Sequence, residues 1–217
     1  MIGEPDKGTG ADARRLVTLS ARQRPAGPSA MAQLEAYWRE LRGSGPLPRR
    51  ADLNPSRIEA ALPHAFLLER VSGGDARMRL AGQALCRHLG LDDARGLPLS
   101  VLFASTAWPT LARWVDRCFD APALVDATVR ARISAFRPPL DGRLLLLPML
   151  DTGGEVTRIL GGLFLDDPAG RSRGLLDLPE GAPSRCEVIR EPVGCGARMQ
   201  KGLSEAERPF LRLVVSN

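Results

Sequence analysis

The sequence predicts an α+β fold in which one antiparallel sheet lies between two helical layers. Three observations support this class. Strand-like segments stand on both sides of a helical block, which is typical of α+β proteins. Two apolar segments, 144–150 and 159–165, resemble strands that have no polar side. An amphipathic segment near the N-terminus, 31–42, is available to cover the second face of the sheet.

The first ordered element is expected to be a helix. Residues 1–29 hold Gly, Pro, Asp and Arg without periodicity, so we predict a disordered tail there. The segment that follows has polar residues on one side and, at helical spacing on the other, Met31, Leu34, Trp38 and Leu41. Gly43 ends this helix of about three turns.

Short elements fill the next stretch of the chain. Asn54 suits a helix N-cap and Pro55 the first helical position, with Ile58, Ala61 and Leu62 facing inward. Two strands, HAFLLERV and RMRLAG, are joined by the turn SGGD. A short helix in ALCRHLGL and a longer one in STAWPTLARWVDRCF follow.

The clearest strand signal is ALVDATVRARIS, residues 123–134. Apolar residues at every second position from Ala123 to Ile133 predict one dry face. The alternate positions include Asp126, Thr128 and Arg130, so the other face is expected to be mostly wet.

The hairpin GRLLLLPMLDTGGEVTRILGGLFL cannot have a wet face. Successive strand residues point to opposite sides, so Leu144 and Leu146 oppose Leu145 and Leu147. Both faces must therefore be covered, and the 31–42 helix is the available cover for the second. Pro148 removes a ladder donor, which suggests a bulge or a strand edge.

The hairpin's second strand has the same character. Ile159, Leu163 and Leu165 fall on one face, and Leu160 and Phe164 on the other. Adjacent glycines at 161 and 162 would let a helix or a ligand approach the backbone.

One domain, residues 30–167, accounts for these elements. Beyond it, residues 168–217 are rich in Arg, Gly and Pro, and we predict a flexible C-terminal extension. No kinase, cyclase or helix-turn-helix pattern fits the remainder.

The order of elements resembles the PAS fold, a five-stranded antiparallel sheet with helices cupped over one face. Several sequence segments are similar to those of a family of stand-alone PAS-like proteins common in alphaproteobacteria. These segments are LEAYWRELR, LPRRADLNPSRIEAALPHAFLLE, RLAG with ALCRHLG, RGLPLSVLF, and LLLLPML with RILGGLF. The likeness runs from about Leu34 to Phe164. Gln83 departs from the small hydroxyl residue expected after RLAG. The resemblance implies the fold and a sensory or regulatory role, and it implies no reaction.

The charge pattern bears on partners. The chain has a net charge of +5, and its basic residues are almost all Arg. Guanidinium groups suit phosphate, so a nucleic-acid-associated protein is the alternative function. However, the Arg residues are scattered among Asp and Glu, whereas a binding footprint should form a patch. Genome composition explains the Arg excess better, and nucleic acid is disfavoured as a partner.

No cofactor is assigned from the sequence. His88 could be an axial haem ligand, but we expect it on the wet side of its short helix. Cys86 lacks the flanking residues of a light-sensing flavin site and is interpreted as a small buried hydrophobe. His64 is expected in a surface turn. The four cysteines form no CxxC pair, and we predict no metal site.

Catalytic motifs are missing from the sequence. It holds no GxSxG, P-loop, GxGxxG or HExxH pattern, so we predict no enzyme activity and name no catalytic residue. The N-terminus has no apolar core and no run approaches the roughly 18 residues of a membrane helix. We therefore expect a cytoplasmic protein that does not contact a membrane.

The sharpest candidate site residues are Leu34, Trp38 and Leu41. Their stripe can pack on the outer face of the sheet or form a dimer surface, and the two interpretations are compatible. We predict a regulatory module that acts through a protein partner or as a homodimer. A small-molecule ligand in the cup between sheet and helices would change the packing of the 31–42 helix.

Overall fold

The computed structural model describes residues 29–71, 76–132, 138–167 and 173–189. The expected disordered tail, apart from Ser29, lies outside the described residues. Within these ranges the chain forms three α-helices, α1 (Ala30–Arg42), α2 (Gln83–Leu89) and α3 (Trp108–Asp120). Four short 3-10 helices are η1 (Arg50–Asp52), η2 (Pro55–Arg57), η3 (Leu62–His64) and η4 (Leu99–Leu102). The strands are β1 (Ala65–Arg70), β2 (Ala76–Ala81), β3 (Ala123–Ala131), β4 (Leu140–Leu150), β5 (Val156–Leu165), β6 (Leu176–Asp177) and β7 (Arg185–Val188).

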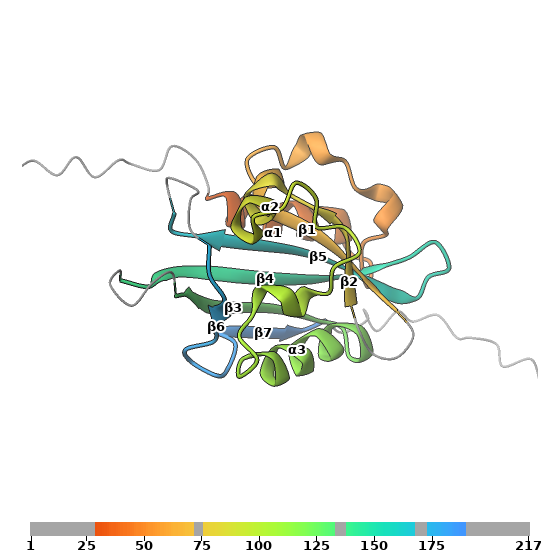
Figure 1. Cartoon of the computed structure of the whole chain (residues 1–217). Coiled ribbons are helices and arrows are strands. Elements are labelled where there is room, and N and C mark those ends of the chain that lie inside the picture. The colour runs from red at the N-terminus through yellow and green to blue at the C-terminus, as the bar shows by residue number, and fades with distance from the viewer. Residues whose placement is uncertain (1–28, 72–75, 133–137, 168–172, 190–217) are drawn as a thin grey trace, which may run out of the picture.

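All strands pair antiparallel in one sheet, in the order β2-β1-β5-β4-β3-β6, with β7 also paired to β3. The predicted hairpin supplies the two central strands, and Leu146 pairs with Gly161 in its register. Figure 1 shows β4 and β5 running side by side through the middle of the molecule. The predicted α+β class with five antiparallel strands, β1 to β5, is confirmed.

The inner face of the sheet is the one covered by α2, η4 and α3. Leu144 and Leu146 of β4 point to this side, and so do Ile159 and Leu163 of β5. The apolar side of α3 packs onto them, with Leu111 fully buried. These residues form one continuous apolar core.

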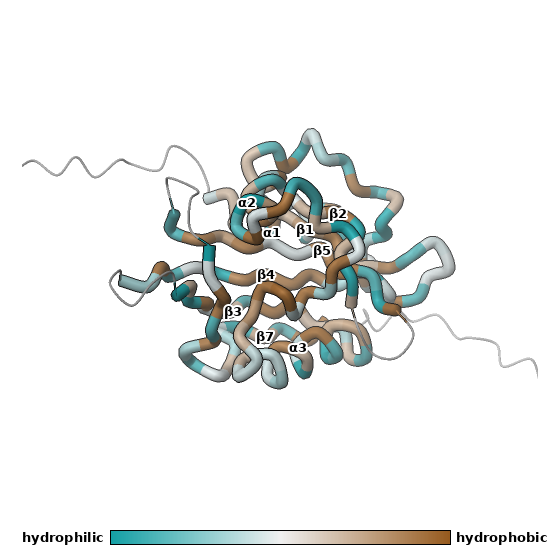
Figure 2. The backbone as a smooth tube through the Cα atoms, in the orientation of Figure 1, coloured by the Kyte–Doolittle hydropathy of each residue, from teal (hydrophilic) through white to brown (hydrophobic). Residues whose placement is uncertain are grey.

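The outer face is covered by α1 and by the segment from Leu47 to Ala61. Leu145 and Leu147 point to this side, and both are fully buried. Residues 144–149 of β4 are therefore dry on both faces, as predicted, and Figure 2 shows the backbone of this strand as a hydrophobic band inside a more polar periphery. Two separate helical layers enclose the central strands.

Two expectations about individual elements were wrong. The outward-facing side of β3 is not mostly wet, because Leu124 is 0% exposed and Asp126 only 5%. After Pro55 the chain forms separate 3-10 turns instead of one helix. Ile58 and Ala61 face inward as expected, but Leu62 is 37% exposed.

The segment 173–189 differs from the flexible extension expected after residue 167. Strand β6 pairs with Arg130 and Ala131, and β7 pairs with residues 123–126, so both extend the sheet beside β3. Backbone hydrogen bonds to an existing strand order this Pro- and Gly-rich segment without any hydrophobic periodicity of its own. The rest of the extension, 168–172 and 190–217, lies outside the described residues.

Candidate functional site

The contact between α1 and the outer face contains the three predicted site residues. Leu34 and Trp38 are 0% exposed and pack within the chain, while Leu41 is half-buried at the margin of the same cluster. The indole Nε1 of Trp38 donates to the carbonyl oxygen of Pro148, 3.0 Å away. The helix is thus fixed to the central strand by both packing and a buried hydrogen bond. A role in an interface between chains stays a prediction.

Two predicted features of β4 and β5 lie near this contact. The bulge predicted near Pro148 is present as a register shift between Met149 and Leu150. A Cβ at Gly162 would lie 2.9 Å from the Cδ2 of Leu34, so the missing side chain lets α1 approach the strand. This confirms the expected helix approach at one of the two glycines. The other glycine, at 161, faces the ring of Phe66 on the inner side.

Tyr37 ties α1 to the loop that carries the RADLNP motif. Its hydroxyl accepts a hydrogen bond from the backbone N–H of Asn54 and donates to the carbonyl oxygen of Asp52 at 3.5 Å. The Asn54 side chain in turn caps η2 by accepting from Ser56 N. The motif that resembles the PAS-like family therefore holds α1 in place.

A network of six charged side chains extends from α1 to the sheet edge. Glu35 accepts hydrogen bonds from Arg39 at 2.9 Å and from both terminal nitrogens of Arg185. Arg39 also donates to both carboxylate oxygens of Glu187, at 3.2 and 2.6 Å. Burial would raise the pKa of Glu35, but hydrogen bonds from Arg185 and Arg39 outweigh it and lower that pKa. Both acids are therefore held ionised.

The network continues across the outer face through Asp126. Arg143 donates to both of its carboxylate oxygens, at 3.0 and 2.7 Å, and Arg185 lies 3.5 Å from it. These partners explain why an aspartate is buried on a strand face predicted to be wet. Sequence reasoning missed this network, because Arg185 lies on the segment expected to be flexible.

The inner side supplies few polar groups. His88 is only 7% exposed, so its expected place on the wet side of α2 was wrong. Cys86 is buried as predicted, and burial strongly raises the pKa of the Cys118 thiol. Among the described residues, no group of three or more His, Cys, Asp or Glu side chains is arranged to hold a metal ion. We assign no cofactor to these residues.

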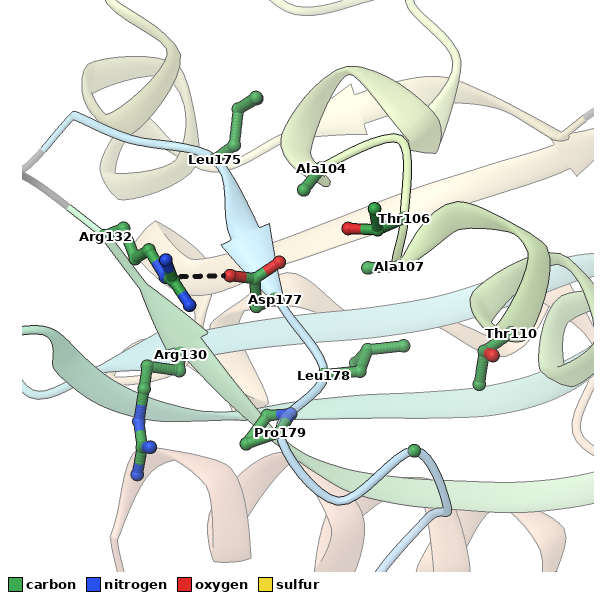
Figure 3. A pocket seen from close by; sticks show the side chains of 11 residues that line it. Ala104, Thr106, Ala107, Thr110, Arg130, Arg132, Leu175, Asp177, Leu178 and Pro179 are labelled. Atoms are coloured by element: carbon green, nitrogen blue, oxygen red, sulfur yellow. Dashed lines mark ion pairs between the residues drawn. The ribbon is translucent and has the colours of Figure 1, made fainter.

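A groove of about 910 Å³ lies where β3, β6 and the start of α3 meet, as Figure 3 shows. Its wall includes Thr106 and Thr110 on one side and Arg130 and Arg132 on the other. The Arg132 guanidinium pairs with Asp177 at 3.2 Å, and Arg130 pairs with an aspartate of β4 at 2.7 Å. Each arginine of the groove therefore already has an acidic partner.

His64 lines a second hollow, of about 500 Å³, beside the N-terminus of α1. The ring lies 5.4 Å from that of Phe164 between centroids, and its Nδ1 is buried with no hydrogen-bond partner. His64 lies in the turn η3, as expected, and is half-buried at the edge of this hollow. Burial lowers its pKa below 6.5.

The surface of the described part of the chain carries no excess charge. These residues contain 18 Arg and 18 Asp or Glu, so the net charge of +5 comes from the segments outside them. None of the helices in this part of the chain is both long and apolar enough to cross a membrane.

Comparisons with known proteins agree with this architecture. A family model described as a PAS domain matches residues 27–164. No curated protein matches the chain. Three solved structures that resemble it are a variant of RsLOV, a LOV protein of Rhodobacter sphaeroides and an RNA-binding Light-Oxygen-Voltage receptor.

The likeness to these three structures is distant. The RsLOV variant shares 18% identity over 52% of this chain and 65% of its own, with a TM-score of 0.39. The Rhodobacter sphaeroides protein shares 16% over 54% and 71%, with a TM-score of 0.39. The receptor shares 19% over 54% and 34%, with a TM-score of 0.38. Similarity at this level says nothing about ligands or partners.

Proposed function

Because this chain belongs to the PAS domain family, whose members are sensory modules, we propose that it is a non-enzymatic regulatory protein that acts through protein–protein interaction. The interaction is with another protein or with a second copy of the chain, in the cytoplasm. A small ligand that binds one arrangement of α1 more tightly than another would shift the balance between them.

The observation that carries this proposal is the way α1 closes the outer face. Its apolar side, centred on Trp38, covers the two central strands. Among the described residues, the indole N–H of Trp38 makes the one hydrogen bond between α1 and β4. Side-chain packing without backbone pairing can rearrange while the sheet keeps its ladders. If α1 moves, Leu145 and Leu147 become the surface that a partner would meet.

Replacing Trp38 tests this role of α1. Trp38→Ala removes a fully buried indole, and we expect a loss of about 3–5 kcal/mol of unfolding free energy together with a changed oligomeric mass. Trp38→Phe, which keeps an aromatic ring but lacks the N–H, is the matched control and should retain the wild-type mass. Unchanged mass together with unchanged stability in Trp38→Ala would remove α1 from the mechanism.

Native mass spectrometry of the purified full chain tests the ligand. A bound small molecule that is lost or weakened in Trp38→Ala would support ligand-dependent packing of α1. If neither the wild type nor Trp38→Ala carries a ligand and the two have the same oligomeric mass, this result would argue against ligand-dependent packing of α1.

The nucleic-acid alternative gains no support from the described surface. Its arginines are balanced by acids, and the groove arginines are paired. A salt titration of DNA binding would reveal it, since phosphate-driven binding weakens steeply as salt rises.

A further inference from the structure

The C-terminal strand β7 lies next to the N-terminal helix α1, although about 150 residues separate the residues that meet. Glu35 and Arg39 are one turn apart on α1. On β7, Arg185 and Glu187 point to the same side, because every second residue of a strand does. The two spacings match, so each charge on the helix meets an opposite charge on the strand.

Both contacts are bidentate, which is the strong form of an Arg–carboxylate hydrogen bond. The Arg185 guanidinium donates to both oxygens of Glu35, and the Arg39 guanidinium donates to both oxygens of Glu187. Such paired bonds fix the relative orientation of the two elements as well as their distance. They join α1 to the edge of the sheet, where β7 pairs with β3.

Apart from its backbone pairing with β3, few side-chain contacts hold β7 in place. It has four residues, and on its other side Cys186 is exposed and Val188 is 47% exposed. Only Ile189, at its end, joins the outer apolar cluster. The side chains of Arg39, Arg185 and Glu187 are 37–40% exposed, so water and salt reach these ion pairs.

We propose that β7 is a removable strap that clamps α1 onto the outer face, and that its detachment frees α1 to move. Half-exposed ion pairs suit this task, because water and salt ions can compete for them, so that they can separate and re-form. The strap deepens the proposed function by naming what controls α1, and only its link to signalling rests on that function. The clamping itself is a property of the isolated chain.

Hydrogen exchange of the full chain, followed by mass spectrometry, tests the strap. In the double variant Arg185→Ala/Glu187→Ala we expect the amides of α1 to exchange about tenfold faster, while those of β4 and β5 stay unchanged. The control is Glu40→Ala, which removes another Arg–Glu pair of α1, the one to Arg57 at 3.0 Å. That variant should exchange within about twofold of the wild type.

Equal α1 exchange in the double variant and the wild type would overturn the strap. If the double variant does not fold, the wild type answers the question, because added sodium chloride should speed α1 exchange by screening the two pairs. Exchange of α1 that does not respond to salt would then refute the proposal.

The experiments distinguish a failure of the strap from a failure of the proposed regulatory function. If Trp38→Ala changes neither mass nor ligand content while the double variant still speeds α1 exchange, the regulatory role fails and the strap stands. The opposite pattern would leave α1 regulatory and β7 passive.

Discussion

The two faces of the sheet are closed in different ways. The inner face is covered by one continuous stretch, from α2 to α3, and few polar groups are buried there. The outer face is covered by α1 and the segment from Leu47 to Ala61, and ion pairs tie α1 to β7, a strand from a distant part of the chain. From this contrast we expect the inner layer to be the fixed core and the outer layer to be the part that moves.

Adjacent glycines on β5 give the sharpest test of this difference and the largest expected effect. Alanine at Gly161 would place its Cβ 2.1 Å from the ring of Phe66, which is 1% exposed and cannot turn away. We expect a loss of about 3 kcal/mol or more in urea unfolding, at the upper end of overpacking costs.

Gly162→Ala meets the outer layer instead, at 2.5 Å from the ring of Phe164 and 2.9 Å from the tip of Leu34. If α1 shifts outward, as we propose, the loss is smaller, about 1–2 kcal/mol. Faster exchange should be confined to α1. A larger loss at Gly162 than at Gly161 would reverse the assignment of fixed and movable layers.

Removing the Tyr37 hydroxyl should have a moderate effect on the outer layer alone. Tyr37→Phe leaves the Asn54 N–H without its partner, and we expect a loss of about 1 kcal/mol in urea unfolding. Thr128→Val, which removes an exposed hydroxyl contact to Ser184, is the control and should change stability by less than about 0.5 kcal/mol. A Tyr37→Phe protein as stable as the control would show that the RADLNP loop does not anchor α1.

Acid should weaken the outer layer in two steps, the smallest of the effects. Burial lowers the pKa of His64, so the folded state disfavours its charged form. Stability is then full above about pH 6.5 and falls as the pH drops through the folded-state pKa. Urea unfolding across this range should show the step in the wild type and not in His64→Gln. Its persistence in His64→Gln would assign the step to another group.

The second step belongs to the strap. Hydrogen bonds from Arg39 lower the pKa of Glu187 below 4.5, and the pKa of Glu35 is lowered as well. Stabilisation by these ionised carboxylates is present above about pH 4.5 and is lost as the pH falls through the folded-state values. Glu187→Gln should reduce this step, measured as α1 hydrogen exchange, and an undiminished step would separate it from the strap.

Much of the fold could be predicted from the sequence, because its central parts have strong patterns. The run Leu144–Leu147 has no polar position, so two covering layers were required, and the stripe of Leu34 and Trp38 identified the second layer. Period-two and helical patterns depend only on neighbours in sequence, and both survive in the structure.

The charge network could not be predicted in this way. From the sequence, Asp126 looks like a solvated strand residue. Its ion pairs with Arg143 and Arg185 compensate for the cost of burying its carboxylate. Strands β6 and β7 have two and four residues, too short to show a period. Their positions follow from the free edge of β3, which exists only once the sheet is assembled.

Covering that edge has a further consequence for how molecules of this protein meet one another. The family match ends at residue 164, whereas the second neighbours of β3 are residues 176–177 and 185–188. A fragment cut at the end of the match would leave the ladder groups of β3 open along one side. An open strand edge recruits strands from other molecules, so such a fragment should aggregate as its concentration rises. We therefore expect the two small strands to keep the edge of β3 from pairing with strands of other molecules.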